Sequence, residues 1–300
     1  MNGLSPRRIF KYVYNVEENT SPRSVLICII LTLTLSCISL INSSCKKSSP
    51  VENLQKIPEV IDSIPAIPGW TLVWNDEFKD TVIDLTKWEF EVNGDGGGNN
   101  ELQYYTAPPR NAYADSGHLV IEAYKEEYMG KQYTSARMRT KKKGDWTYGM
   151  FEIRAKLPSG RGLWPAIWML PTDEYYGGWP QSGEVDIMEM LGHEANKVYG
   201  TIHYSSTSGS HEHTGNSYVL PKGSFSDDYH LFALIWDVTG FDWYVDGVNY
   251  FTVFHRQPFD KRFHILLNVA VGGNWPGSPD YTTKFPQRMY IDYVRVYKKN

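Results

Sequence analysis

Hydrophobic and polar positions alternate along much of the chain from His118 onward. Seven segments carry β-branched and aromatic residues with a period of two, which is the pattern of a strand with one buried face. We predict strands over His118–Tyr124, Met150–Leu157, Lys197–Tyr204, Tyr229–Asp237, Phe241–Gly247, Phe263–Val271 and Met289–Lys298. Helical periodicity is nearly absent, so this region is expected to be all-β.

Turn-forming residues separate these segments, and many short strands with turns between them favour a sandwich or a barrel. No shift in composition and no internal repeat divides residues 69–300, so we predict one domain there. Long loops are common at functional sites. Four segments are predicted to be loops: Asn93–Asn100, Pro171–Ser182, Ser205–Ser217 and Gly272–Asp280. Two of them carry a tryptophan, Trp179 or Trp275, which favours a substrate-binding edge.

A different pattern precedes the domain. Residues 25–41 are an uncharged apolar run behind four basic residues. The run is slightly shorter than a membrane span, which needs about 20 residues. Basic residues followed by an apolar run are the layout of an export signal. Cys45 follows two serines, which resembles a bacterial lipoprotein signal. We therefore predict a signal over residues 1–45 and a protein that is lipid-anchored at the cell surface or secreted. A plain signal peptide and an uncleaved anchor are the alternatives.

Residues 46–68 are polar and contain four prolines, so they are predicted to be an extended tether. No cysteine occurs after Cys45, which excludes a disulfide, a cysteine-based metal site and a cysteine nucleophile in the domain. The net charge of −4 gives no reason to expect nucleic acid as a partner. The 10 Trp and 21 Tyr supply flat apolar faces with polar edges, which suit sugars. A monomer is expected.

The run Gly183–Met190, GEVDIMEM, is the most informative segment. On a regular strand, side chains alternate between the two faces, so Glu184 and Asp186 share one face. Glu189 lies five residues after Glu184 and would point to the other face. One extra residue, accommodated as a β-bulge near Ile187 and Met188, brings Glu189 back to the face of the other two acids. The sequence therefore predicts a bulge in this strand.

Three acids on one strand face raise each other's proton affinity. Glycoside hydrolysis uses such a pair, because one ionised carboxylate attacks the anomeric carbon and one protonated carboxyl donates to the leaving oxygen. Neighbours along one strand stay close, which favours the separation of about 5 to 5.5 Å of retaining enzymes. A solvated acidic edge and a calcium site are the alternatives that the run alone leaves open.

The motif ExDxxE, here Glu184, Asp186 and Glu189, resembles the signature of family 16 glycoside hydrolases in its longer, bulged form. The resemblance runs from about Trp70 to Lys298 and is strongest to the laminarinases, the endo-β-1,3-glucanases. Five stretches carry it in order: Asn99–Tyr105, Ser135–Lys141, Gly149–Pro171, Trp179–Gly192 and Gly272–Gly277.

The resemblance implies a β-jelly-roll of two curved antiparallel sheets with the substrate across the concave face. It implies that Glu184 is the nucleophile, that Glu189 is the general acid/base and that Asp186 tunes the nucleophile. His203, on the strand after the catalytic one, is expected to reach Glu189. His211 and His213 are interpreted as part of a polar loop rather than as a metal pair. The expected substrate-binding residues are Asn100, Glu101, Arg137, Trp164, Trp168, Trp179, His203 and Trp275, with a core position as the alternative for Trp168 and a surface ion pair for Arg137.

Many relatives bind a structural Ca²⁺ on the convex side, and the matching ligand positions here are Glu77, Gly117 and Asp292. Pairing of the two acids with basic residues is the alternative. No cofactor is expected for the chemistry. The function expected from the resemblance is a retaining endo-β-1,3-glucanase acting on laminarin-type β-glucans. The alternatives are a mixed-linkage β-glucanase, another family 16 polysaccharide hydrolase or transglycosylase, and, least favoured, a non-catalytic β-glucan-binding sandwich.

Overall fold

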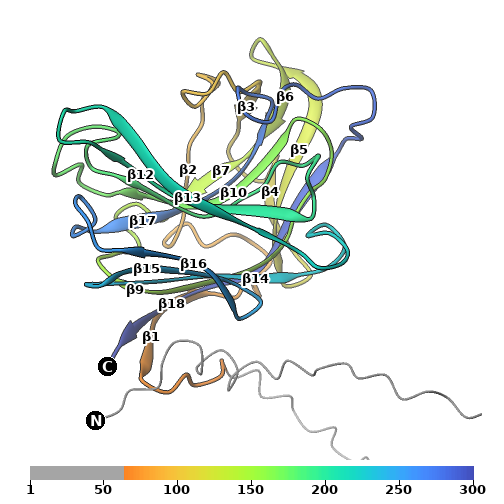
Figure 1. Ribbon diagram of the computed structural model, residues 1–300. Helices are drawn as coiled ribbons and strands as arrows, with labels where there is room; N and C mark the ends of the chain where they lie inside the picture. Colours follow the sequence, from red (N-terminus) through yellow and green to blue (C-terminus); the bar gives the residue numbers. More distant parts are fainter. Residues whose placement is uncertain (1–63) are drawn as a thin grey trace, which may run out of the picture. The chain divides into compact units, whose positions relative to one another are not determined.

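Two β-sheets face each other in the computed structural model, which describes residues 64–300 (Figure 1). One sheet has ten strands. Its spatial order is β16 (Val248–Phe254), β15 (Gly240–Val245), β14 (His230–Asp237), β9 (Gly149–Lys156), β18 (Gln287–Lys299), β5 (His118–Tyr128), β6 (Lys131–Ser135) and β3 (Gln103–Tyr105), with β1 (Trp70–Asp76) paired to β18 and β4 (Ala112–Asp115) paired to β5.

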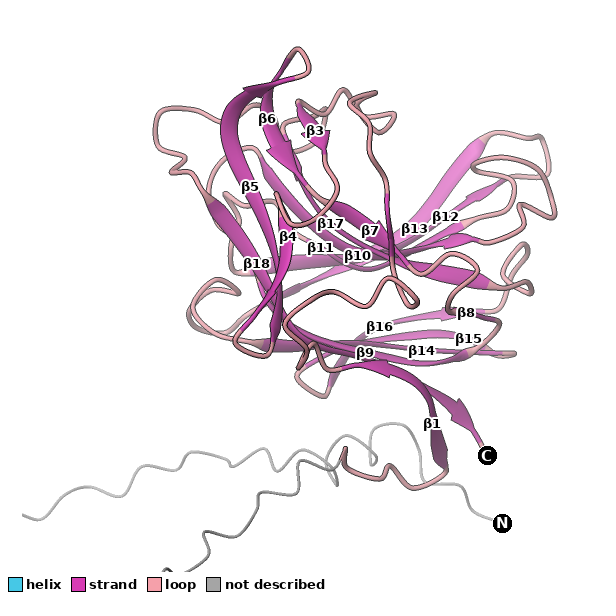
Figure 2. Ribbon diagram, turned by 180° about the vertical axis from the view of Figure 1, so that it is seen from behind, coloured by secondary structure: helices cyan, strands magenta, loops and turns pink. Residues whose placement is uncertain are grey.

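The second sheet has eight strands and supplies the floor of the site. Its order is β13 (His211–Val219), β12 (Lys197–Ser205), β11 (Glu184–Glu189), β10 (Leu163–Pro171), β17 (Phe263–Val271), β7 (Arg137–Arg139) and β2 (Glu89–Phe90), with β8 (Asp145–Trp146) paired to β17. Every pairing of the named strands is antiparallel except that of β3 with β6. The curved layers are seen from behind in Figure 2. The predicted all-β sandwich is thus confirmed. Within residues 64–300, no helix is long and apolar enough to cross a membrane.

All seven predicted strands are present, and β17 matches its prediction at both ends. The prediction of a loop over Ser205–Ser217 was wrong, because most of that segment belongs to β13. Strand β13 lies at the edge of its sheet and contacts water on both faces, so it lacks the alternation that identifies a half-buried strand. The other three predicted loops lie mainly outside the strands.

The main core lies between the sheets and contains one face of each central strand. On β10, for example, Leu163, Ile167 and Met169 are buried in it. A smaller apolar cluster covers the outer face of the ten-stranded sheet, and Ile67 belongs to it with only 4% of its surface exposed. Ile67 is part of the predicted tether. The predicted signal over residues 1–45 and the tether up to residue 63 lie outside the described residues.

The predicted bulge is present in β11. Asp186 pairs with Thr201 and Glu189 pairs with Tyr199, so three steps along β11 match two steps along β12. Against β10, Asp186 pairs with Trp168 and Met188 with Ile167, which leaves Ile187 as the extra residue. Ile187 and Met188 are both buried in the core.

The bulge is held from the opposite sheet. The indole Nε1–H of Trp243, on β15, donates to the backbone carbonyl of Asp186 over 2.9 Å. Trp243 is fully buried, so this hydrogen bond lies in the core, away from water. Gly200 leaves the necessary space, because a Cβ there would lie 2.5 Å from the indole ring of Trp243.

We predict that Trp243→Phe destabilises the fold by about 1–3 kcal/mol beyond the effect of lost volume, because it removes a buried hydrogen bond to the Asp186 carbonyl. It should also lower activity, since the bulge orients Glu189. Urea denaturation gives the free energy of unfolding, and steady-state kinetics give the activity.

Trp236→Phe is the matched control. Trp236 is also fully buried on the ten-stranded sheet, but its Nε1–H has no hydrogen-bond partner within residues 64–300. Equal losses of stability in the two variants would show that the bond from Trp243 contributes nothing.

Candidate active site

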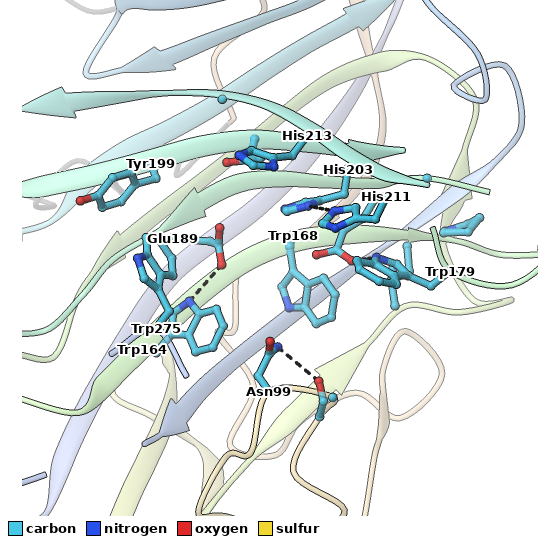
Figure 3. Close-up of a pocket in the computed structure, with 18 of the residues that line it drawn as sticks. Asn99, Trp164, Trp168, Trp179, Glu189, Tyr199, His203, His211, His213 and Trp275 are labelled. Atoms are coloured by element: carbon cyan, nitrogen blue, oxygen red, sulfur yellow. Dashed lines mark hydrogen bonds between the residues drawn. The ribbon is translucent and has the colours of Figure 1, made fainter. Parts of the chain in front are cut away.

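A cleft of about 1270 Å³ crosses the eight-stranded sheet on the face turned away from the core (Figure 3). Strands β10 and β11 form its floor, and β12 and β13 form one wall. The loops around residues 97–99 and Trp275 close the other side. The cleft therefore lies on the sheet that carries the three acids.

Glu184 and Glu189 both line this cleft, as the strand-parity argument requires. Each carboxylate accepts a hydrogen bond from a different tryptophan. Trp179 Nε1 donates to Glu184 Oε2 over 2.6 Å, and Trp164 Nε1 donates to Glu189 Oε1 over 2.9 Å. Because each indole bonds to one carboxylate, the two acids have separate and fixed surroundings.

The surroundings also raise the pKa of each acid, through partly different causes. Burial and then the charge of Asp186 raise the pKa of Glu184 to about 8. Burial and then the charges of Asp186 and Glu184 raise the pKa of Glu189 well above its ordinary range. Burial raises the pKa of Asp186 to about 7. The charges of two neighbouring acids thus raise the pKa of Glu189, whereas that of one, Asp186, raises the pKa of Glu184.

His203 lies beside Asp186. Its Nε2 is 3.1 Å from Asp186 Oδ2. The antiparallel register pairs His203 with Glu184 and pairs Tyr199 with Glu189. Electrostatically, His203 opposes the rise in the pKa of both glutamates, so the prediction that it reaches Glu189 stays a prediction.

Trp168 lies on the cleft face of β10 and not in the core. Its Nε1 donates to Asn268 Oδ1 over 2.7 Å, and the guanidinium of Arg137 stands 4.5 Å from the centre of its ring. Arg137 also forms an ion pair with Glu91 at 3.1 Å. The two alternatives for Arg137 therefore coexist, since one side chain lines the cleft and holds an ion pair.

Two predicted binding residues do not line the cleft. Glu101 is 6% exposed, and its carboxylate accepts hydrogen bonds from Gln103 and Tyr105. A Cβ on Gly97 would lie 2.4 Å from that carboxylate, so the loop can pack on Glu101 only with glycine there. Asn100 bonds to Asn274 over 2.9 Å and ties the two loops together. Neither Glu101 nor Asn100 lines the cleft.

Aromatic rings form the two ends of the catalytic region. Trp275 packs edge-on against Trp164, with ring centres 5.4 Å apart, and against Tyr199 at 5.0 Å. Trp179 is 54% exposed and Trp275 is 40% exposed. These exposed flat faces suit stacking on sugar rings.

Several cleft residues were not predicted from the sequence. Tyr199 and Thr201 share the cleft face of β12 with His203, so the strand alternation could have identified them. Other lining residues come from β13 or from segments distant in the sequence, so local alternation could not identify them. The further lining residues include Asn99, Arg139, Lys141, Glu174, His211, His213, Asn216 and His264.

The predicted calcium ligands have other partners. Glu77 forms two hydrogen bonds with the guanidinium of Arg295, at 2.9 and 2.8 Å. Asp292 pairs with Arg154. Calcium at these positions stays a prediction, and the ion would have to displace both arginines. Among residues 64–300, Glu184, Asp186 and His203 are the one set of three His, Asp or Glu side chains whose ligand atoms, as the side chains stand, all lie within 4.8 Å of one another.

Comparison with known proteins agrees with this site. Residues 99–295 match the glycosyl hydrolases family 16. The chain belongs to that family. A β-glucanase of Rhodothermus marinus is 44% identical over 250 residues, which cover 77% of this chain and 86% of that protein.

Solved family 16 structures share the fold. The laminarinase catalytic domain of Thermotoga maritima is 49% identical, with a TM-score of 0.71 over 77% of this chain and 99% of that one. LamA of Zobellia galactanivorans, solved in complex with laminaritriose and laminaritetraose, is 34% identical, with a TM-score of 0.69 over 76% of this chain and 99% of that one.

The two indole donors allow a test of which acid works in which protonation state. We predict that Trp179→Phe moves the acidic limb of the pH profile of kcat/KM to higher pH. This follows if Glu184 acts as the anion, because loss of the donor raises its pKa. We predict that Trp164→Phe moves the alkaline limb to higher pH. This follows if Glu189 acts as the acid, because loss of the donor raises its pKa.

Phenylalanine keeps an aromatic face at each position, so the movement of a limb reports the lost hydrogen bond separately from sugar stacking. If Trp164→Phe moved the acidic limb and Trp179→Phe the alkaline limb, the two roles would be reversed.

Proposed function

We propose that the protein is a retaining endo-β-1,3-glucanase that hydrolyses laminarin-type β-glucans, with Glu184 as the nucleophile and Glu189 as the general acid/base. The observation that carries the proposal is the bulge at Ile187, which brings two carboxyl groups of different proton affinity to the floor of one open cleft. An open cleft suits attack within a long polymer.

The chemistry follows from this arrangement. Ionised Glu184 attacks the anomeric carbon of the sugar while Glu189 donates its proton to the departing oxygen. Glu189, now an anion, then takes a proton from water, and that water releases the sugar from Glu184. Asp186, which lies between the acids on the same strand face, raises the proton affinity of both. A sugar hydroxyl in place of water would give transglycosylation by the same steps.

The β-1,3 preference has support from the relatives. The T. maritima structure is that of a laminarinase, and the Z. galactanivorans protein binds laminari-oligosaccharides. Stacking surfaces at Trp179 and Trp275 flank the acids and suit glucosyl rings. Mixed-linkage β-glucan is the second substrate to test.

We predict that Glu184→Gln and Glu189→Gln each lower the rate on laminarin by about 10²–10⁴-fold. On a β-glucoside with a dinitrophenol leaving group, Glu189→Gln should keep the first step fast, because that group leaves without a proton. Glu184→Gln should remain inactive on both. NMR of the first products should show the β-anomer.

Glu212→Gln is the control, because Glu212 is an exposed acid of β13 that does not line the cleft. Near-normal hydrolysis of laminarin by either cleft variant would refute the catalytic assignment. Faster hydrolysis of mixed-linkage β-glucan than of laminarin would refute only the linkage preference. Tight binding of laminarin with no release of reducing ends would support the non-catalytic alternative.

We also propose that the protein is exported and anchored through a lipid on Cys45. The basic residues, the apolar run and the cysteine that follows it support this proposal. In a bacterial host, Cys45→Ala should move the protein from the membrane fraction to the soluble exported fraction. An unchanged membrane fraction would argue for an uncleaved anchor.

A further inference from the structure

Three histidines lie together on one wall of the cleft. His203 is on β12, and His211 and His213 are on β13, where residues two apart share a face. His203 and His213 are directly opposite each other in the strand register. The ring centres of the three-histidine cluster (His203, His211 and His213) are 5.1 to 6.1 Å apart, and Figure 3 shows the three rings beside one another.

Two of the rings already face each other through nitrogen atoms. His203 Nδ1 and His211 Nε2 are 2.9 Å apart. Two imidazole nitrogens bound to one tetrahedral zinc ion, each at about 2.0–2.1 Å, lie roughly 3.3 Å apart. A small rotation of the rings would therefore replace the hydrogen bond with shared coordination of an ion.

The opposite edge of His203 faces a buried carboxylate. Its Nε2 is 3.1 Å from the carboxylate of Asp186, which is 1% exposed. A histidine that binds a metal usually donates its other ring N–H to a carboxylate or carbonyl, and this bond fixes its orientation. Asp186 Oδ2 accepts no hydrogen bond within residues 64–300, so it is free to accept the Nε2–H of His203 once the ring turns to place Nδ1 on an ion.

We propose that His203, His211 and His213 form a binding site for a divalent transition metal ion, of which Zn²⁺ is the test case. Two histidines spaced His-x-His on one strand and a third on its neighbour supply three imidazole ligands. The ring of His213 would have to turn toward the other two, because the ligand nitrogens of the three do not yet all lie within 4.8 Å of one another. Water would complete a tetrahedron. Imidazole suits Zn²⁺ and not Ca²⁺, so this site differs in chemistry from the predicted calcium site. His211 and His213 are exposed, so ions can enter from solvent.

An ion at this site would inhibit the proposed reaction. His203 pairs across the strands with Glu184, and His211 lies 4.6 Å, between ring centres, from Trp179, which donates to Glu184. The ion would occupy the cleft beside the nucleophile, and its charge would hold the carboxylate back from attack. The binding site itself does not depend on the proposed function, whereas the inhibition does.

Calorimetric titration of the purified protein with Zn²⁺ should show one ion per chain. His211→Ala and His213→Ala should each weaken binding by roughly 10-fold or more, the order seen when the groups that support a metal site are lost. Co²⁺ in place of Zn²⁺ should give the visible absorption of a tetrahedral ion, and this absorption should be lost in both variants. His255→Ala is the control, because His255 is exposed and outside the cleft.

Zn²⁺ should also slow laminarin hydrolysis reversibly, with EDTA restoring the rate, and this sensitivity should be reduced in the His211 and His213 variants. Equal Zn²⁺ affinity in the wild type, His211→Ala and His213→Ala would overturn the proposal. So would loss of binding only in Glu184→Gln, because it would place the ion on Glu184, Asp186 and His203. Binding of Zn²⁺ without inhibition would support the metal site but refute its effect on catalysis.

Discussion

The hydrogen bond from Trp243 to the carbonyl of Asp186 joins the two sheets at the β-bulge that separates Glu184 from Glu189. A bulge leaves part of the strand ladder unpaired, and a buried carbonyl without a partner is costly. The indole satisfies that carbonyl from the far side of the core, and Gly200 leaves room for it. The positions of Glu184 and Glu189 on one face thus depend on a residue of the other sheet that never contacts the cleft.

The three acids proposed for catalysis, Glu184, Asp186 and Glu189, lower the stability of the fold. Each has a raised pKa because burial disfavours its charged form, and the charges of its neighbours add to the effect for Glu184 and Glu189. An unfolded chain would release these protons at lower pH, so the site lowers stability as pH rises. The broad core between the sheets and the hydrogen bonds from Trp164 and Trp179 offset this cost. The destabilisation is therefore confined to a few buried acids on the floor of the cleft.

Alternation along the strands was enough to predict the sandwich and to require a bulge in β11, because parity is a local property of the chain. Register is not local. The pairing of His203 with Glu184 rather than Glu189 depends on how β12 aligns with β11 after the bulge. The burial of Glu101 depends on packing against Gln103 and Tyr105. Trp168 was ambiguous because an indole fits a core and a cleft equally well, and only the face of β10 decides between them.

Strand β13 escaped identification because it is polar, and this polarity has a consequence of its own. An edge strand exposes unpaired backbone groups that can recruit a strand from another molecule and start aggregation. The sequence HEHTGNSYV on β13 offers few apolar side chains to such a partner, and Asn216 ties the strand to β16 through the carbonyl of Tyr250. The residues that line this wall of the cleft therefore also discourage the sheet from growing by the addition of foreign strands.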